Sequence, residues 1–204
     1  MTAGDLVAEF DRAWSDPRYT KTDLPPVHIN KVLRDHYKVD PPLTYTRTML
    51  WDMEVRKASA PDFYIPSAVR PDSARKWESG VDNEFTRVST QRLWQERETF
   101  GLVIEHVHLD PARQSVVFIG APDFTTPDGE VLTADTRQPL FHVDHWVEGD
   151  EDDPINRWRI VHLTGAPDPA LAGVFDAMAA SPYLRDFVEV HIRTVLGRTL
   201  TRVP

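Results

Sequence analysis

Residues 100–124 read FGLVIEHVHLDPARQSVVFIGAPDF, and this stretch decides the fold class. Two runs that alternate between apolar and polar residues, 100–109 and 115–124, flank the residues Asp110-Pro111-Ala112-Arg113. Alternation with a period of two is typical of β-strands, and the four central residues suit a type I turn. The stretch therefore predicts a β-hairpin.

Further strands are predicted on both sides of this hairpin. Residues 84–95 alternate and are rich in Thr, Val and aromatic side chains. Residues 139–147 and 158–163 flank an acidic, solvated tip. Residues 45–55 carry mostly apolar side chains at odd positions and mostly polar ones at even positions, which predicts a first strand. Together these strands predict a curved antiparallel sheet.

Helical spacing is confined to the two ends of the chain. Residues 4–15 predict a short amphipathic helix. Asp168 and Pro169 suit a helix start, and a second start at Ser181-Pro182 precedes an apolar stripe that ends near Gly197. Short helical turns and loops are expected over 58–80. The predicted class is α+β, with the sheet wrapped around a long C-terminal helix.

Residues 1–44 form the predicted helix followed by a polar, proline-rich arm, and 45–204 form the main domain. The arm is interpreted either as a contact that builds a homodimer or as a long surface loop. The sequence has no internal repeat.

The composition excludes several functions. The 204 residues hold 23 Lys and Arg against 32 Asp and Glu, a formal charge of −9, so a nucleic-acid partner is not expected. The sequence has no cysteine, no run of about 20 apolar residues and no signal peptide at its start. We therefore expect a cytoplasmic protein that has neither a disulfide nor a membrane partner.

The order of elements from Tyr45 to Gly197, the Leu50-Trp51-Asp52 sequence and the amphipathic last helix resemble the helix-grip fold of the START/Bet v1-like (SRPBCC) superfamily. This superfamily includes polyketide cyclases and aromatases of secondary metabolism. The resemblance implies a deep apolar cavity between sheet and C-terminal helix, with chemistry done by polar side chains and no cofactor. The N-terminal extension leaves a cone-shaped NTF2-like fold as an alternative, although that family places its long helices first.

Four residues are candidate acid-base catalysts. His142 and Asp144 share one strand face, where a carboxylate could orient an imidazole, and His145 points to the other face. His106 lies, with His108, Leu102 and Ile104, on a stripe that resembles an inward face. His191 lies on the apolar stripe of the last helix. For His142 and Asp144 the alternative is a polar strand face exposed to water. For His106 it is a core histidine with a satisfied hydrogen bond, and for His191 a residue at the edge of the helix.

Other side chains are candidates for ligand binding, because arginine can hold an anionic or phenolic group and aromatic residues can line a pocket. Surface ion pairs and ordinary core packing are the alternatives. The candidates are Arg47, Trp51, Tyr64, Arg92, Trp94 and His108.

Metal, nucleophile and nucleotide chemistry are not predicted. His106 and His108 form a His-x-His pair, but the glutamate of a cupin motif does not follow it. There is no Gly-x-Ser-x-Gly and no phosphate-binding glycine loop. The first hypothesis is a cofactor-independent cyclase, aromatase or dehydratase that acts on a hydrophobic polyketide-like or aromatic molecule. The alternatives are a non-catalytic carrier of a hydrophobic ligand and an interaction module.

Overall fold

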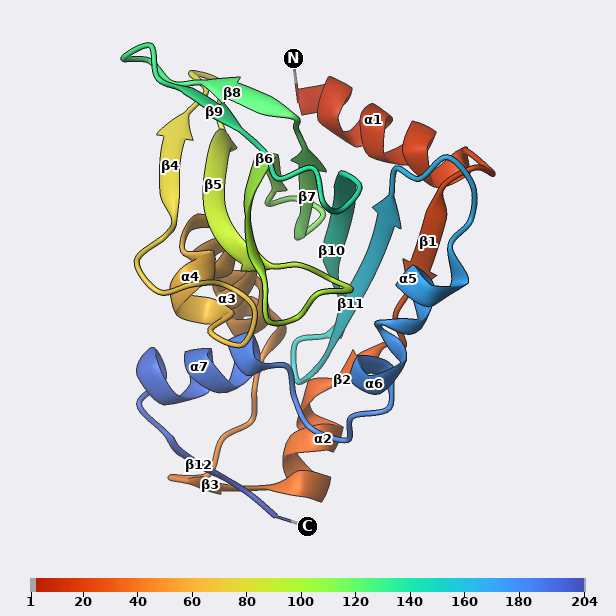
Figure 1. Cartoon of the computed structure of the whole chain (residues 1–204). Helices are drawn as coiled ribbons and strands as arrows, with labels where there is room; N and C mark the ends of the chain where they lie inside the picture. Colours follow the sequence, from red (N-terminus) through yellow and green to blue (C-terminus); the bar gives the residue numbers. More distant parts are fainter. Residues whose placement is uncertain (1–2, 204) are drawn as a thin grey trace.

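The computed structural model describes residues 3–203 and has an antiparallel sheet at its centre (Figure 1). In the described residues this sheet has eight strands, in the order β1-β11-β10-β7-β6-β5-β4, with β2 also pairing with β11. The strands are β1 Thr20–Asp23, β2 Val27–His28, β4 Arg75–Glu78, β5 Glu84–Arg92, β6 Phe100–Asp110, β7 Ser115–Gly120, β10 Phe141–Asp150 and β11 Asp153–His162.

Two small two-stranded sheets lie beside the main one. Strand β3 (Tyr37–Asp40) pairs with β12 (Thr199–Arg202), which places the last strand beside a segment from the first quarter of the chain. Strand β8 (Asp123–Thr125) pairs with β9 (Val131–Thr133) in a hairpin at the far end of the main sheet (Figure 1).

The helices cover the two faces of the main sheet differently. Helix α1 packs on β6, β7 and β10, and we call the face that it covers the outer face. Helix α3 packs on the opposite face, here the inner face, and α7 packs on α3 and α4. The helices are α1 Ala3–Ser15, α2 Ile29–His36, α3 Arg47–Ser59, α4 Pro61–Tyr64, α5 Pro169–Gly173, α6 Asp176–Ala179 and α7 Asp186–Thr194.

The predicted hairpin is confirmed. Strands β6 and β7 pair antiparallel, and the Asp110 carboxylate accepts hydrogen bonds from the backbone N–H groups of Ala112 and Arg113 at 3.0 Å each. The predicted strand 115–124 is divided, because β7 ends at Gly120 and β8 begins at Asp123. The other strands predicted after residue 84 and the N-terminal helix are also present.

The strand predicted over 45–55 is wrong, because this stretch begins helix α3. The Thr46 hydroxyl accepts a hydrogen bond from the N–H of Met49 at 3.1 Å and caps the helix. The helical stripe was hidden because two of its buried positions carry charges. The buried residues of α3 are Leu50, Met53, Glu54, Lys57 and Ala58.

The prediction of a long C-terminal helix is also wrong. The chain forms three short helices instead, and the last, α7, has nine residues. Asp168 caps α5 as predicted, accepting hydrogen bonds from the N–H groups of Ala170 and Leu171. The backbone of Arg185 is extended, so the second helical segment begins only at Asp186. Beyond α7 the chain turns at Gly197, which has a φ of 62°, and enters β12.

The segment 16–42, predicted as a proline-rich arm, contributes β1, β2, α2 and β3. Thr20 pairs with His162, and Val27 pairs with Asn156, so β1 and β2 extend the main sheet along β11. The prolines at 25 and 26 fall between these two short strands.

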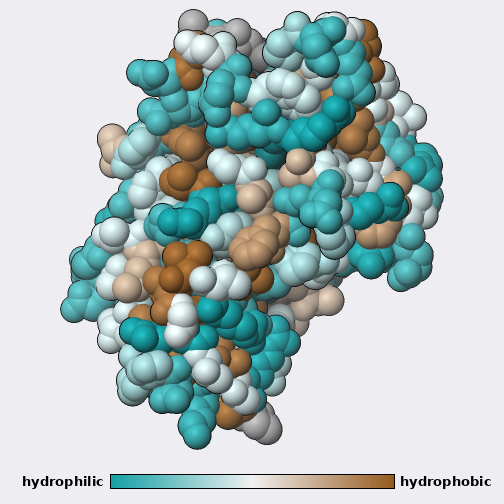
Figure 2. All heavy atoms as spheres, turned by 90° about the vertical axis from the view of Figure 1, so that its left-hand side faces the viewer, coloured by the Kyte–Doolittle hydropathy of each residue, from teal (hydrophilic) through white to brown (hydrophobic). Residues whose placement is uncertain are grey.

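The surface has scattered hydrophobic groups. Figure 2 shows that the side carrying β4, α4 and α7 is mostly hydrophilic, with hydrophobic residues in several separate groups. Phe63 and Val131 are the most exposed of the large hydrophobic residues, at 53% and 66%. No helix within residues 3–203 is long and apolar enough to cross a membrane.

Candidate functional site

A cavity of about 120 Å³ lies between the inner face of the sheet and the helices that cover it. A cavity of about 150 Å³ in another protein holds benzene, so this space accommodates roughly one aromatic ring. Much of its wall is apolar and aromatic. The apolar walls include Trp94, Phe118, Phe141, Val143, Trp158 and Phe187.

A row of three ionisable side chains from α3 and β10 ends at the cavity, and two of the three line it. Lys57 Nζ forms a buried ion pair with the Glu54 carboxylate and lies 2.9 Å from His145 Nδ1. Asn156 on β11 donates to the other Glu54 oxygen at 2.8 Å. Lys57 and His145 line the cavity, and Glu54 lies behind them, fully buried. We call Glu54, Lys57 and His145 the acid-base row.

The protonation states of the acid-base row follow from its burial. Burial would raise the pKa of Glu54, but the charge of Lys57 lowers it to about 2, so Glu54 is a carboxylate. Burial lowers the pKa of Lys57, and burial with the Lys57 charge lowers the pKa of His145 to about 4. At neutral pH the imidazole is therefore neutral. Because an ammonium can only donate, His145 Nδ1 accepts and its proton lies on Nε2.

Aromatic contacts hold the acid-base row in place. The His145 ring stacks on Trp158 with a centroid distance of 5.1 Å and meets Phe118 edge to face. Lys57 Nζ lies 4.3 Å from the centroid of the Phe187 ring. His145 Nε2 makes no hydrogen bond within the described part of the chain. It is therefore the ring nitrogen that is free to form a hydrogen bond with a ligand.

A second buried ion pair lines the same cavity. Arg87 Nε on β5 donates to Glu105 Oε2 on β6 at 2.8 Å. Arg87 also donates to the carbonyl oxygens of Lys57 and Ala58, at 3.2 and 2.9 Å, at the end of α3. This arginine therefore binds the sheet to the helix that carries Lys57.

A groove of about 790 Å³ adjoins the cavity. Trp94, Arg97 and Met178 line both spaces. The other groove residues come from the loop after β5 and from α5 and α6, so the opening lies between this loop and these helices (Figure 1).

His142 and Asp144 share a face as predicted, but it is the outer face, under α1. His142 Nδ1 accepts from the N–H of Gly120 at 3.1 Å, and its Nε2 lies 3.5 Å from Glu9 on α1. Asp144 accepts two hydrogen bonds from Arg159, at 2.9 and 3.0 Å. The two predicted partners form no hydrogen bond with each other in residues 3–203, and neither lines the cavity.

The inward face predicted for His106 and His108 is wrong in the same way. Neighbouring residues of a strand alternate between faces, and on β6 it is Glu105 that lines the cavity. His106 Nδ1 lies 2.9 Å from the Thr86 hydroxyl, in a hollow of the outer face beside Phe124. His108 lies 3.6 Å from Glu84.

His191 is fully buried, but it lies between α7 and α3 rather than at the cavity. Its Nδ1 is 2.7 Å from the Tyr45 hydroxyl, and its Nε2 is 3.0 Å from Asp52. Tyr64 is buried in the apolar cluster that also contains Tyr45. Neither residue lines the cavity.

The four remaining ligand-binding candidates divide into two pairs. Arg92 and Trp94 line the cavity. Arg47 instead donates to Gln114 at 2.6 Å and to the Gly149 carbonyl oxygen at 3.1 Å. Trp51 is partly buried and packs against the apolar cluster that includes Phe118 and Val143. Arg47 and Trp51 do not line the cavity.

Four residues of the site were not predicted from the sequence: Glu54, Lys57, Arg87 and Glu105. Glu54 and Lys57 are three residues apart, and together with Leu50 and Ala58 they follow the helical spacing that could have identified them. Within residues 3–203 no group of three or more His, Cys, Asp or Glu side chains gathers in a way that could hold a metal ion.

No family model and no curated protein matches this sequence. Solved structures do match. The Zhui aromatase/cyclase from Streptomyces sp. R1128 is similar with a TM-score of 0.52 and 11% identity, over 83% of this chain and 95% of that one. It belongs to the Bet v1-like, or SRPBCC, proteins. This chain has the Bet v1-like fold. The match decides against the NTF2-like alternative.

A second match widens the range of functions found on the Bet v1-like fold. A dicamba monooxygenase bound to 3,6-dichlorosalicylic acid has a TM-score of 0.53 and 12% identity, over 90% of this chain and 53% of that one. Ginseng major latex-like protein 151 from Panax ginseng has a TM-score of 0.44 and 10% identity, over 79% and 95%. The Bet v1-like fold is thus shared by cyclases and oxygenase domains, and it does not by itself specify an activity.

Proposed function

We propose that this protein binds an aromatic or polyketide-like small molecule in the cavity and dehydrates or cyclises it by cofactor-independent acid-base catalysis. The observation that carries the proposal is the acid-base row. It places a neutral imidazole, backed by a buried ammonium, at the wall of an apolar cavity. A buried lysine and histidine with lowered pKa values at a cavity are typical of catalytic sites.

His145 serves as the general acid in this proposal. Its Nε2–H donates a proton to a hydroxyl group of the substrate, which then leaves as water. Lys57 passes a proton to Nδ1 of the same ring over 2.9 Å, and the lowered pKa of Lys57 favours this step. The Glu54 carboxylate stabilises the charge of Lys57 before the transfer.

Glu105 serves as the general base. One of its oxygens accepts from Arg87, and the residue lines the cavity. In a β-hydroxy ketone, the carboxylate removes the proton between the carbonyl and hydroxyl carbons, and a double bond forms as water leaves. The products are an unsaturated ketone and water, so no oxidant or cofactor is required. In a ring, this step brings the molecule closer to an aromatic one.

The apolar walls hold one ring of the substrate while the polar groups act on it. Arg92 and Trp94 keep the ligand-binding role proposed from the sequence. His142, Asp144, His106 and His191 have no catalytic role in this proposal. The cyclase among the similar structures and the bound aromatic acid in the oxygenase support a small aromatic ligand.

The test uses a small β-hydroxy ketone, the aldol adduct of benzaldehyde and acetone. Loss of water gives benzylideneacetone, which is followed by its ultraviolet absorbance. The wild-type protein is expected to accelerate this dehydration above the buffer rate. His145→Asn is expected to lower the rate about 100-fold, because removal of a general acid typically costs about 10²–10⁴.

His142→Asn is the matched control, since His142 is also a buried β10 histidine but lies under α1. Its rate should stay within about twofold of the wild type. An unchanged rate in folded His145→Asn protein would contradict the proposed catalysis. If the wild type bound benzylideneacetone without accelerating the dehydration, the carrier alternative would replace it, which the largely apolar cavity wall also suits.

A further inference from the structure

Three arginines gather where the cavity opens into the groove. Arg92 ends β5, Arg97 lies in the loop that follows, and Arg185 precedes α7, yet all three line the cavity. Arg97 lines the groove as well. We call Arg92, Arg97 and Arg185 the arginine rim.

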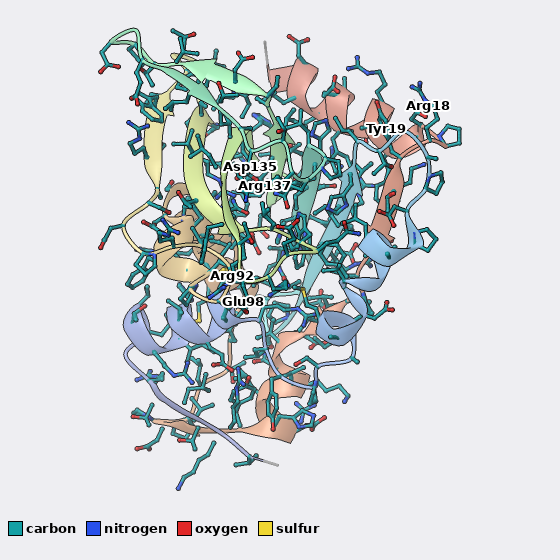
Figure 3. The ribbon with its side chains drawn as sticks, viewed as in Figure 1. Arg18, Tyr19, Arg92, Glu98, Asp135 and Arg137 are labelled. Atoms are coloured by element: carbon teal, nitrogen blue, oxygen red, sulfur yellow. The ribbon has the colours of Figure 1, made fainter. Side chains whose placement is uncertain are left out.

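The carboxylates near the arginine rim offset only part of its positive charge. Glu98 lies 4.0 Å from Arg92, and its side chain is 99% exposed, so the attraction is weak and screened (Figure 3). Asp186 lines the cavity too and offsets part of the Arg185 charge, while its carboxylate also accepts from the hydroxyl of Ser67 and from the N–H of Phe187.

Neither Arg185 nor Arg97 forms an ion pair within residues 3–203. The Arg185 guanidinium donates to the carbonyl oxygen of Met178 at 2.5 Å. The side chain of Arg185 is half-buried, and burial lowers its pKa, which reflects the cost of holding a charge away from water. For Arg97, the contact seen is made by its backbone oxygen, which accepts from Arg92 at 2.7 Å.

The excess of positive charge is local. The groups that line the cavity include the five cations Lys57, Arg87, Arg92, Arg97 and Arg185 and the two carboxylates Glu105 and Asp186. Glu54 balances Lys57 from behind, Glu105 balances Arg87, and Asp186 offsets one of the three remaining arginines, so a surplus of two positive charges belongs to the arginine rim. The whole chain carries a formal charge of −9, so this cationic mouth stands against the overall charge.

We propose that the ligand of this cavity carries a carboxylate, which Arg97 and Arg185 bind at the mouth while the apolar part of the ligand occupies the cavity. The guanidinium group is suited to this role because it presents paired donors that match the two oxygens of a carboxylate. This proposal rests on the proposed function and adds the chemical class of the substrate, an aromatic acid.

The test compares two molecules of the same shape, cinnamate and benzylideneacetone, which differ in a carboxylate and a methyl ketone. Binding is followed by the quenching of tryptophan fluorescence or by calorimetry. The wild-type protein is expected to bind cinnamate about tenfold more tightly. Higher salt should weaken the binding of cinnamate and leave that of benzylideneacetone unchanged.

Arg97→Gln and Arg185→Gln are each expected to remove most of this preference while changing the affinity for benzylideneacetone less than about twofold. Arg97→Gln keeps the test valid if Arg185→Gln fails to fold, since Arg97 is exposed. Arg75→Gln is the control, because Arg75 pairs with Glu130 away from the cavity. Its preference should equal that of the wild type.

The two proposals fail in different ways. Equal binding of the two molecules, or a preference that survives both substitutions, would overturn the proposal that Arg97 and Arg185 bind a carboxylate. The result of the dehydration test would not be affected. Failure to bind either molecule would overturn both proposals, because the cavity itself would then hold no aromatic ligand.

Discussion

Arg87 and Glu105 stand directly opposite each other on β5 and β6 and form an ion pair away from water, with 2.8 Å between Nε and Oε2. The Arg87 guanidinium also lies 4.3 Å from the centroid of the Phe118 ring and donates to the end of α3. One side chain thus connects three strands and a helix around the cavity. The position of Lys57 depends on this connection.

Arg87→Met is expected to destabilise the protein by about 3–5 kcal/mol, because it leaves the Glu105 carboxylate buried and unpaired. Urea denaturation measures the change. The double variant Arg87→Met, Glu105→Leu should recover much of this loss, since it removes both charges. A double variant as unstable as the sum of both single variants would contradict this explanation.

Acid is expected to destabilise the protein between pH 6.5 and pH 4. Burial lowers the pKa values of His142, His145 and His162 to about 4, while in the unfolded chain they stay near 6.5. Between these values the unfolded chain binds protons that the folded protein excludes, so the unfolding free energy falls by about 1.4 kcal/mol per pH unit for each histidine. Denaturation curves at several pH values test this slope.

His162→Phe is expected to reduce the pH dependence of the unfolding free energy by about 1.4 kcal/mol per pH unit, which is the contribution of one histidine. His162 is fully buried, neither of its ring nitrogens has a hydrogen-bond partner within the described residues, and it lies among Phe141, Phe175 and Trp94. A phenyl ring suits this environment and cannot take up a proton. An unchanged pH slope would show that His162 is not the neutral buried group inferred here.

The rate of dehydration should also depend on the pKa of His145. Above pH 4 its neutral ring accepts from Lys57 and donates from Nε2. Below that pH the ring is an imidazolium that repels the Lys57 ammonium across 2.9 Å, which opens the acid-base row. We expect an acid limb in the pH–rate profile near pH 4 to 5. A limb near pH 6.5 would indicate an exposed histidine instead.

Gly120→Ala is expected to cost about 2 kcal/mol or more, since a side chain there would overlap the backbone oxygen of Phe141 on β10. Phe141 lines the cavity, so binding of benzylideneacetone should weaken as well. Gly165→Ala is the control, because nothing lies within 4 Å of the added atom. Thermal denaturation of both variants measures the difference, and equal stability would contradict the predicted overlap.

Val143→Phe is expected to block ligand binding without unfolding the protein. Val143 is a β10 residue that lines the cavity, and the added ring occupies a space of roughly its own size. Benzylideneacetone should no longer quench tryptophan fluorescence, while the circular dichroism spectrum stays unchanged. Undiminished binding would locate the ligand outside the cavity.

The sheet was predictable because its signals are local. The Asp110 turn and the alternation along β6 and β10 depend only on neighbouring residues. The face of each strand was less predictable, because both faces are buried here. Helix α1 covers the face of His142, and α3 covers the face of His145, so apolar and polar positions do not separate inside from outside.

The candidate site was hidden for a related reason. Glu54 and Lys57 are charged residues that lie in the core, and charge normally indicates a surface position. They remain buried because they pair with each other and with His145 and Asn156, which come from strands about 90 and 100 residues later in the chain. A pattern within α3 alone does not contain these partners.

The pairing of Thr20 with His162 and of Tyr37 with Arg202 constrains the order in which the strands can pair during synthesis. Strands β1 and β3 are synthesised early, and their partners β11 and β12 follow about 136–165 residues later. Their edges stay unpaired in the meantime, so the nascent chain depends on slow, long-range closure and on protection from premature association.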